Sequence, residues 1–134
     1  MMSMRRHACR LAVCVIAGAL ADCANVGPPV TESDDGRTID IALGQRVDIR
    51  LLSHRTTGYR WMPAVPLSGV LASLGEAAYT SDAAAAGVAG AGGIETWSYR
   101  ASRRGTEALR FEYRRPWEGE ATAARVVRYT IRVR

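Results

Sequence analysis

The sequence predicts an all-β fold, an immunoglobulin-like antiparallel β-sandwich preceded by a cleavable signal peptide. Three observations support this prediction: a short apolar run near the N-terminus, several later segments in which apolar and polar residues alternate, and a length of 134 residues, which suits one domain. We therefore expect a signal peptide over residues 1–21, a flexible tether over residues 22–36 and a single sandwich domain over residues 37–134.

The N-terminal segment has the features of a secretory signal. Arg5, Arg6 and Arg10 precede an apolar run over residues 11–20. A helix needs about 20 apolar residues to cross a membrane, so this run is too short for a permanent span. The small residues of Ala19-Leu20-Ala21 suit cleavage after residue 21.

Cys23 leaves two fates open for the exported chain. Leu20-Ala21-Asp22-Cys23 resembles the lipobox of bacterial lipoproteins, in which the cysteine carries a lipid, although Asp22 departs from the small uncharged residue usual there. The alternative is simple secretion. The expected location is therefore outside the cytoplasm, as a periplasmic protein, a membrane-anchored lipoprotein or a secreted protein. The other two cysteines lie in the signal, so we expect no internal disulfide. We also expect the chain to be a monomer.

The net charge of +5 gives little reason to expect a nucleic-acid partner. All 18 basic residues are arginine, and removal of residues 1–21 takes three of them and no acid. The remaining 15 basic and 13 acidic side chains are interleaved along the chain, whereas nucleic acids bind basic stripes or patches.

Alternation with period two begins near Arg37 and recurs to the C-terminus. Each segment would bury one face and expose the other, as in a two-sheet sandwich. Residues 25–36 are rich in Pro, Gly, Ser, Asp and Thr, which is typical of a tether. Residues 63–93 are interpreted as strand in their first half and as loop in their second half. The expected inward residues are Ile39, Ile41 and Leu43; Val47, Ile49 and Leu51; Tyr59 and Trp61; Leu109, Phe111 and Tyr113; and Val127, Tyr129, Ile131 and Val133.

Three connections between these segments carry the functional information. Residues 53–58 form a polar turn before Tyr59, and residues 90–93 are a glycine-rich stretch that leads into a strand. In the third, Arg115-Pro116-Trp117, a large apolar tryptophan lies at the tip of a connection. Turn formation does not explain such a residue, and tryptophan is enriched at binding hot spots.

Taken in order, these motifs resemble the chagasin family of inhibitors of papain-type cysteine proteases. That family has an Asn-Pro-Thr-Thr-Gly-Tyr/Phe loop followed by Trp, a Gly-x-Gly-Gly loop that runs into a strand with an aromatic residue, and an Arg-Pro-Trp sequence. The resemblance covers residues 37–134. The matching residues here are Thr56-Thr57-Gly58-Tyr59 with Trp61, Gly90-Ala91-Gly92-Gly93 with Trp97, and Arg115-Pro116-Trp117.

The resemblance implies an immunoglobulin-like sandwich that plugs the cleft of a papain-like, cathepsin-type protease reversibly with three loops at one end. The threonine loop would reach the floor of the cleft, the glycine loop would pair its backbone beside the substrate site, and the tryptophan would pack on the other side. The residues implied to bind the protease are Thr56, Thr57, Gly58, Tyr59, Gly90, Gly92, Gly93, Arg115, Pro116 and Trp117.

One departure from the family pattern affects the first of these loops. His54-Arg55 stands where the family has Asn-Pro, so the loop lacks the fixed φ of proline and the turn-stabilising side chain of asparagine. We therefore expect a more mobile loop with lower affinity, and a pH dependence of binding from His54.

The sequence also bears on two other classes of function, a binding module and an enzyme. An exported or surface-anchored immunoglobulin-like module could use the same loop tips on a non-protease partner, because a fold alone does not determine function. An enzyme is not expected, because His54 is the one histidine beyond the signal, the adjacent Ser53 and His54 have no third partner indicated, and the sequence has no metal cluster or cofactor motif. Glu95, Glu112 and Glu118 are interpreted as surface charges.

Overall fold

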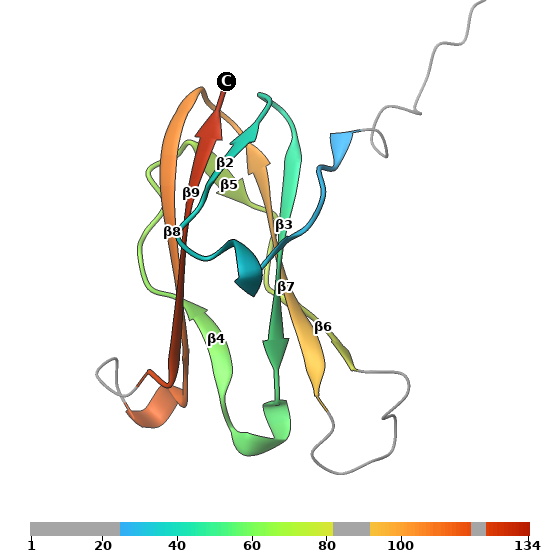
Figure 1. Ribbon diagram of the computed structural model, residues 1–134, viewed down its shortest axis with the longest axis vertical. Coiled ribbons are helices and arrows are strands. Elements are labelled where there is room, and N and C mark those ends of the chain that lie inside the picture. The colour runs from blue at the N-terminus through green and yellow to red at the C-terminus, as the bar shows by residue number, and fades with distance from the viewer. Residues whose placement is uncertain (1–24, 82–91, 119–122) are drawn as a thin grey trace, which may run out of the picture.

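Two β-sheets pack face to face in the computed structural model, which describes residues 25–81, 92–118 and 123–134 (Figure 1). The first sheet has the order β1-β3-β7-β5, and β6 pairs with β7 along the same edge as β5. Its strands are β1 (Val30–Thr31), β3 (Arg46–Ser53), β5 (Leu71–Ser73), β6 (Ala78–Ser81) and β7 (Gly93–Ala101). The second sheet has the order β2-β9-β8-β4, with β2 (Thr38–Ile41), β4 (Arg60–Pro63), β8 (Gly105–Arg114) and β9 (Arg125–Val133).

The predicted all-β sandwich is confirmed, with one refinement of its pairing. The long strands pair in antiparallel fashion, whereas the short edge strands β1 and β2 run parallel to β3 and β9, so both sheets are mixed. Three short 3-10 helices complete the described chain: η2 (Glu32–Asp34), η3 (Arg55–Thr57) and η5 (Pro116–Glu118). Among these helices none has the length and apolar character needed to cross a membrane.

Alternating side chains from both sheets form the core, as the period-two pattern predicts. The chain's single phenylalanine, Phe111, is fully buried and links the sheets, since its ring lies 5.6 Å from that of Trp97 on β7 and 6.4 Å from that of Tyr129 on β9. The buried inward residues of the central strands are Val47, Ile49 and Leu51 on β3, Leu109, Phe111 and Tyr113 on β8, and Val127, Tyr129, Ile131 and Val133 on β9.

Leu43 was predicted to continue the inward row of Ile39 and Ile41, and this prediction is wrong. The strand ends at Ile41, and Leu43 is 45% exposed in a turn that carries the chain from the second sheet to the first. This turn is closed by Gln45, whose side chain accepts a bond from the amide of Ala42 at 2.9 Å, and Gly44 adopts φ +81°. Alternation ends where the turn begins, so the leucine points outward.

The segment expected to be a flexible tether belongs in part to the sandwich. Val30 is 3% exposed in the core, and β1 pairs with β3 through Val30 and Ile49. The prediction failed because Pro, Gly and acidic residues are typical of linkers, while the contacts that hold this segment lie far away in the sequence. The sandwich therefore begins before residue 37.

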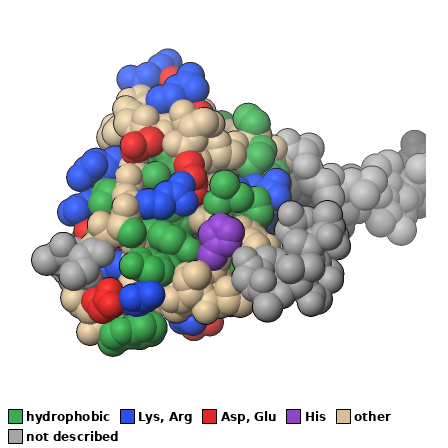
Figure 2. Space-filling view, turned by 60° about the horizontal axis from the view of Figure 1, so that its bottom comes forward, with side chains coloured by type: hydrophobic (Ala, Val, Ile, Leu, Met, Phe, Trp, Pro, Cys, Tyr) green, Lys and Arg blue, Asp and Glu red, His purple; other side chains and the backbone are tan. Residues whose placement is uncertain are grey.

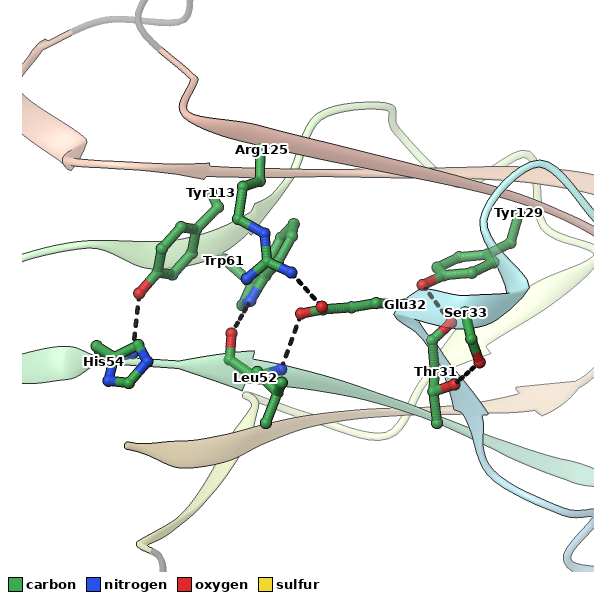
Figure 3. A network of polar contacts seen from close by, with 9 residues as sticks. All are labelled: Thr31, Glu32, Ser33, Leu52, His54, Trp61, Tyr113, Arg125 and Tyr129. Carbon is green, nitrogen blue, oxygen red and sulfur yellow. Dashed lines mark hydrogen bonds and ion pairs between the residues drawn. The ribbon is translucent and has the colours of Figure 1, made fainter. Parts of the chain in front are cut away.

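Polar contacts fasten the same segment between the two sheets (Figure 3). Glu32 Oε1 accepts a hydrogen bond from the amide of Leu52 at 3.0 Å, and its other oxygen pairs with Arg125 of β9. The Tyr129 hydroxyl donates to the carbonyl of Thr31 at 2.9 Å. Burial and the nearby carboxylates raise the pKa of Tyr129 above its usual value, which favours the protonated hydroxyl that donates this bond.

The structure also tests the strand and loop predicted over residues 63–93 and the three glutamates predicted to be surface charges. In the region 63–93, β5 is a short strand within the half expected to be strand, whereas β6 begins at the midpoint and extends into the half expected to be loop. Most of that second half lies outside the described residues. Glu95 and Glu112 are not surface charges, because Glu95 faces the interior and Glu112 is covered by Arg110 and Arg114 at 2.8 and 3.5 Å. Glu118 is exposed, as expected.

A substitution at Val30 tests whether residues 30–36 belong to the folded domain. Val30→Ala should lower the free energy of unfolding in urea by about 2 kcal/mol, because it removes buried methyl groups and leaves a cavity. Val65→Ala, at a valine that is 39% exposed, is the matched control and should change it by less than about 0.5 kcal/mol. If both substitutions lower the free energy of unfolding by less than about 0.5 kcal/mol, residues 30–36 are part of the tether and not of the folded domain.

Candidate functional site

The turn of residues 54–58, the turn of residues 115–118 and the start of β7 lie at one end of the sandwich, the lower end in Figure 1. Ser53 at the end of β3 pairs with Gly93 at the start of β7, and Arg60 at the start of β4 pairs with Arg114 at the end of β8. We call residues 54–58 the first loop, the glycine-rich stretch before β7 the second, and residues 115–118 the third. Strand pairing alone thus brings together motifs that are about 60 residues apart.

The first loop is a tight turn closed by its own hydrogen bonds. The amide and the hydroxyl of Thr57 both donate to the carbonyl of His54, at 3.1 and 2.6 Å, and the amide of Gly58 donates to the carbonyl of Arg55 at 3.1 Å. Gly58 has φ +81°, which an L-residue adopts only with strain. Thr56 and Thr57 are exposed at the tip of this turn.

His54 and Arg55, which stand in place of the Asn-Pro of the chagasin-type motif, are held by contacts from outside the first loop. The amide of His54 donates to the Tyr113 hydroxyl at 2.8 Å (Figure 3). The guanidinium of Arg55 lies 4.3 Å above the ring of Tyr79. These contacts attach the loop to the sandwich, while the predicted mobility of the loop, its lower affinity and the pH dependence of binding stay predictions.

The first and third loops are in direct contact. A Cβ on Gly58 would lie 2.6 Å from the tip of the Trp117 ring, so only glycine allows this approach. Arg115 Nε donates to the carbonyl of Thr57 at 3.2 Å, and its guanidinium lies 4.6 Å above the ring of Tyr59. Trp117 nevertheless remains 71% exposed, so most of this large apolar ring faces solvent.

The second loop contributes Gly92 and Gly93 to the described part of this end. A Cβ on Gly92 would lie 2.9 Å from Cε1 of His54, so the imidazole packs against the Gly92 backbone and joins this loop to the first. Gly93 is buried, and a Cβ there would lie 2.5 Å from the ring carbon Cζ of Tyr79. Gly90 lies outside the described residues.

The residues expected at the site divide into an exposed tip and a supporting layer. Thr56, Thr57, Pro116 and Trp117 are exposed, whereas Gly58, Tyr59, Gly92 and Arg115 are half-buried. Tyr59 stacks on Tyr113 with ring centroids 5.3 Å apart and supports the loops from below. Figure 2 shows this end facing the viewer, with arginines and acids among hydrophobic side chains over its described part.

Sequence reasoning missed part of the supporting layer. Tyr113 was expected as a core residue, which it is, but its hydroxyl also holds the first loop. Nothing in the sequence indicates that Arg55, Tyr79 and Glu95 are in contact. Within residues 25–81, 92–118 and 123–134, no group of three or more His, Cys, Asp or Glu side chains could hold a metal ion.

Comparison with known proteins identifies the family to which this architecture belongs. Residues 40–133 match the family model described as Chagasin family peptidase inhibitor I42. The chain belongs to the chagasin family of peptidase inhibitors. It is therefore an inhibitor rather than an enzyme.

Curated relatives and a solved structure agree with the family match. The chain is 33% identical to chagasin of Trypanosoma cruzi over 94 residues, which are 67% of this chain and 83% of chagasin. It is 34% identical to amoebiasin-1 of Entamoeba histolytica over 92 residues, 69% of this chain and 86% of the relative. The crystal structure of a cysteine protease inhibitor from Entamoeba histolytica covers 81% of this chain and all of its own, with a TM-score of 0.70 and 24% identity, a likeness of fold.

The contact between Gly58 and Trp117 can be tested with two glycine-to-alanine variants. Gly58→Ala and Gly36→Ala both place a side chain at positive φ, so each should cost about 1 to 2 kcal/mol in urea unfolding. Nothing lies within 4 Å of a Cβ on Gly36, so only Gly58→Ala should displace Trp117 and raise acrylamide quenching of tryptophan fluorescence. Equal quenching in the two variants would contradict the contact.

Proposed function

We propose that this chagasin-family chain inhibits papain-type cysteine proteases reversibly by inserting its three loops into the active-site cleft. The observation that carries the proposal is the joining of the exposed Thr56-Thr57 turn and the exposed Trp117 at one end of a rigid sandwich. An edge of this kind is narrow at the threonines and apolar at the tryptophan. It suits a groove that is flanked by an apolar surface.

The conformation of the first loop explains how it could fill a catalytic site without being cut. Cleavage requires a peptide bond held in line with the nucleophile. In the first loop the backbone is curled into η3 by the bonds of Thr57 and Gly58 to His54 and Arg55, and Gly58 adopts positive φ. The loop therefore brings small side chains and carbonyl groups toward the nucleophile in a geometry that does not present an extended peptide.

The contacts between the loops support tight binding, because they reduce the order that binding must impose. Free loops lose conformational entropy when they dock, at a cost of about 0.5 to 1.5 kcal/mol for each immobilised flexible side chain. Arg115 is already held by Thr57, Tyr59 and Glu118, and Trp117 already rests on Gly58. The second loop could add main-chain pairing through Gly92 and Gly90, where bare backbone permits close approach.

We also propose that the chain is exported as a monomer, either released or attached to a membrane through a lipid on Cys23. The arginines and apolar run of residues 1–20, the Ala19-Leu20-Ala21 sequence and the following cysteine support this. The first strand that the structure describes, β1, begins at Val30, so cleavage after residue 21 removes none of the described strands. Mass spectrometry of the mature chain separates the fates, since cleavage after residue 21 leaves Asp22 first and lipidation leaves a modified Cys23 first.

The decisive experiment is a titration of papain and a cathepsin L-type enzyme with the chain from Asn25 onward, with recovery of the inhibitor on a gel. Reversible loss of activity with the chain uncut is the expected result. Failure to inhibit either enzyme at micromolar concentration would contradict the proposal and favour a binding module with a non-protease partner.

Trp117→Ala should weaken inhibition by about 2 to 4 kcal/mol, the usual range for an interface hot spot. Full burial of the indole would contribute on the order of 5 kcal/mol at most, from about 200 Å² at about 25 cal/mol per Å², and association costs offset part of this. Leu43→Ala is the matched control, because Leu43 is an exposed apolar residue in the turn at the other end of β3. A loss below about 0.5 kcal/mol for Trp117→Ala, or an equal loss for both variants, would remove Trp117 from the interface.

A further inference from the structure

Beneath the first loop, the interior of the sandwich changes from apolar to polar. Glu95 faces inward from β7 and is 2% exposed, and Ser53, the last residue of β3, is fully buried beside it. The Ser53 hydroxyl donates to Glu95 Oε1 at 2.6 Å. A buried carboxylate of this kind is costly unless it is paired and hydrogen-bonded.

Arg55 covers this carboxylate from the loop. Its Nε lies 3.9 Å from Glu95 Oε1, and its guanidinium stacks on the ring of Tyr79, which pairs with Glu95 across β6 and β7. The side chain of Arg55 is 40% exposed, so it closes the end of the sandwich with one side toward solvent and the other toward Glu95. The first residue of η3 is thus attached by its side chain to the sheet below.

We infer that Glu95, through Arg55, positions the first loop for binding, although Glu95 itself cannot touch a partner. Arg55 begins the turn that carries Thr56 and Thr57, so holding its guanidinium holds the exposed tip. Arginine leaves its own φ free, so a chain with arginine at this position needs a restraint from elsewhere, and the buried carboxylate supplies it. This inference deepens the proposed function and rests on it, because its first test measures the inhibition constant for papain.

A double-mutant cycle measures the coupling between the two side chains. Glu95→Gln keeps an acceptor for Ser53 and removes the charge, and Arg55→Gln removes the cation. Each variant should raise the inhibition constant for papain by about tenfold, and the double variant should also raise it by about tenfold, because both changes break the same contact. An increase near a hundredfold in the double variant, or unchanged inhibition by the single variants, would overturn the inference.

Two further variants separate positioning from a general effect of charge or stability. Arg55→Lys retains a cation beside Glu95 but loses the planar guanidinium stacked on Tyr79, so its inhibition constant should lie between those of the native chain and Arg55→Gln. Arg104→Gln removes an exposed arginine from the turn between β7 and β8, at the other end of these strands, and should leave inhibition unchanged. If Arg55→Lys is as weak as Arg55→Gln, or if Arg104→Gln is equally weak, the inference fails. The comparison of Arg55→Lys, Arg55→Gln and Arg104→Gln tests the inference even if Glu95→Gln does not fold.

Amide hydrogen exchange reads the same coupling without a protease. The amides of Thr57 and Gly58 close η3, so their exchange should be about tenfold faster in Arg55→Gln, Glu95→Gln and the double variant alike, with β9 unchanged. If the native chain does not inhibit papain but these rates change together, the proposed function fails and the positioning role stands. If exchange at Thr57 and Gly58 does not respond to either substitution, the positioning role is wrong.

Discussion

Antiparallel pairing of β3 with β7 and of β4 with β8 is the constraint on which the rest of the structure depends. Each ladder continues to the last residue before a loop, at Ser53 and Gly93 in one sheet and at Arg60 and Arg114 in the other. The loops therefore start from backbone atoms that are fixed by hydrogen bonds and by a core behind them. Short connections on such a base can hold a defined shape that free peptides of the same sequence would not hold.

Carboxylates that are buried or half-buried reinforce the sandwich where the apolar core is thin. The chain has a single phenylalanine and many alanines, so large apolar side chains are few. Glu32 joins the N-terminal segment to β3 and β9, Glu95 joins the first loop to β7, and Glu107 accepts three bonds from Ser68 and Leu71. Glu95 and Glu107 lie on strands and bind groups of a connection, whereas Glu32 lies on the connection and pairs with groups of two strands, so these acids position connections as well as stabilising the fold.

Contacts among the loops then turn three separate motifs into one surface. Gly58 admits the ring of Trp117, Arg115 spans from the third loop to the carbonyl of Thr57, and His54 lies against Gly92. An inhibitor gains from such an arrangement, because order that already exists in the free protein does not have to be created on binding. The departure from Asn-Pro is compatible with this arrangement, since side-chain contacts of His54 and Arg55 take over the restraint.

The sequence alone determined the sandwich, the inward faces of β3, β8 and β9, and the family, because period-two alternation and motif order are local properties of the chain. It did not predict that Leu43 turns outward, that residues 30–36 join the sheets, or that Glu95 and Glu112 are buried. Nor did it show which loops touch, since Gly58 and Trp117 meet only after β4 and β8 have paired. Alternation reports which face of its own strand a residue occupies. The partner that it meets across the fold depends on strand pairing between distant segments, and only the tertiary structure decides that.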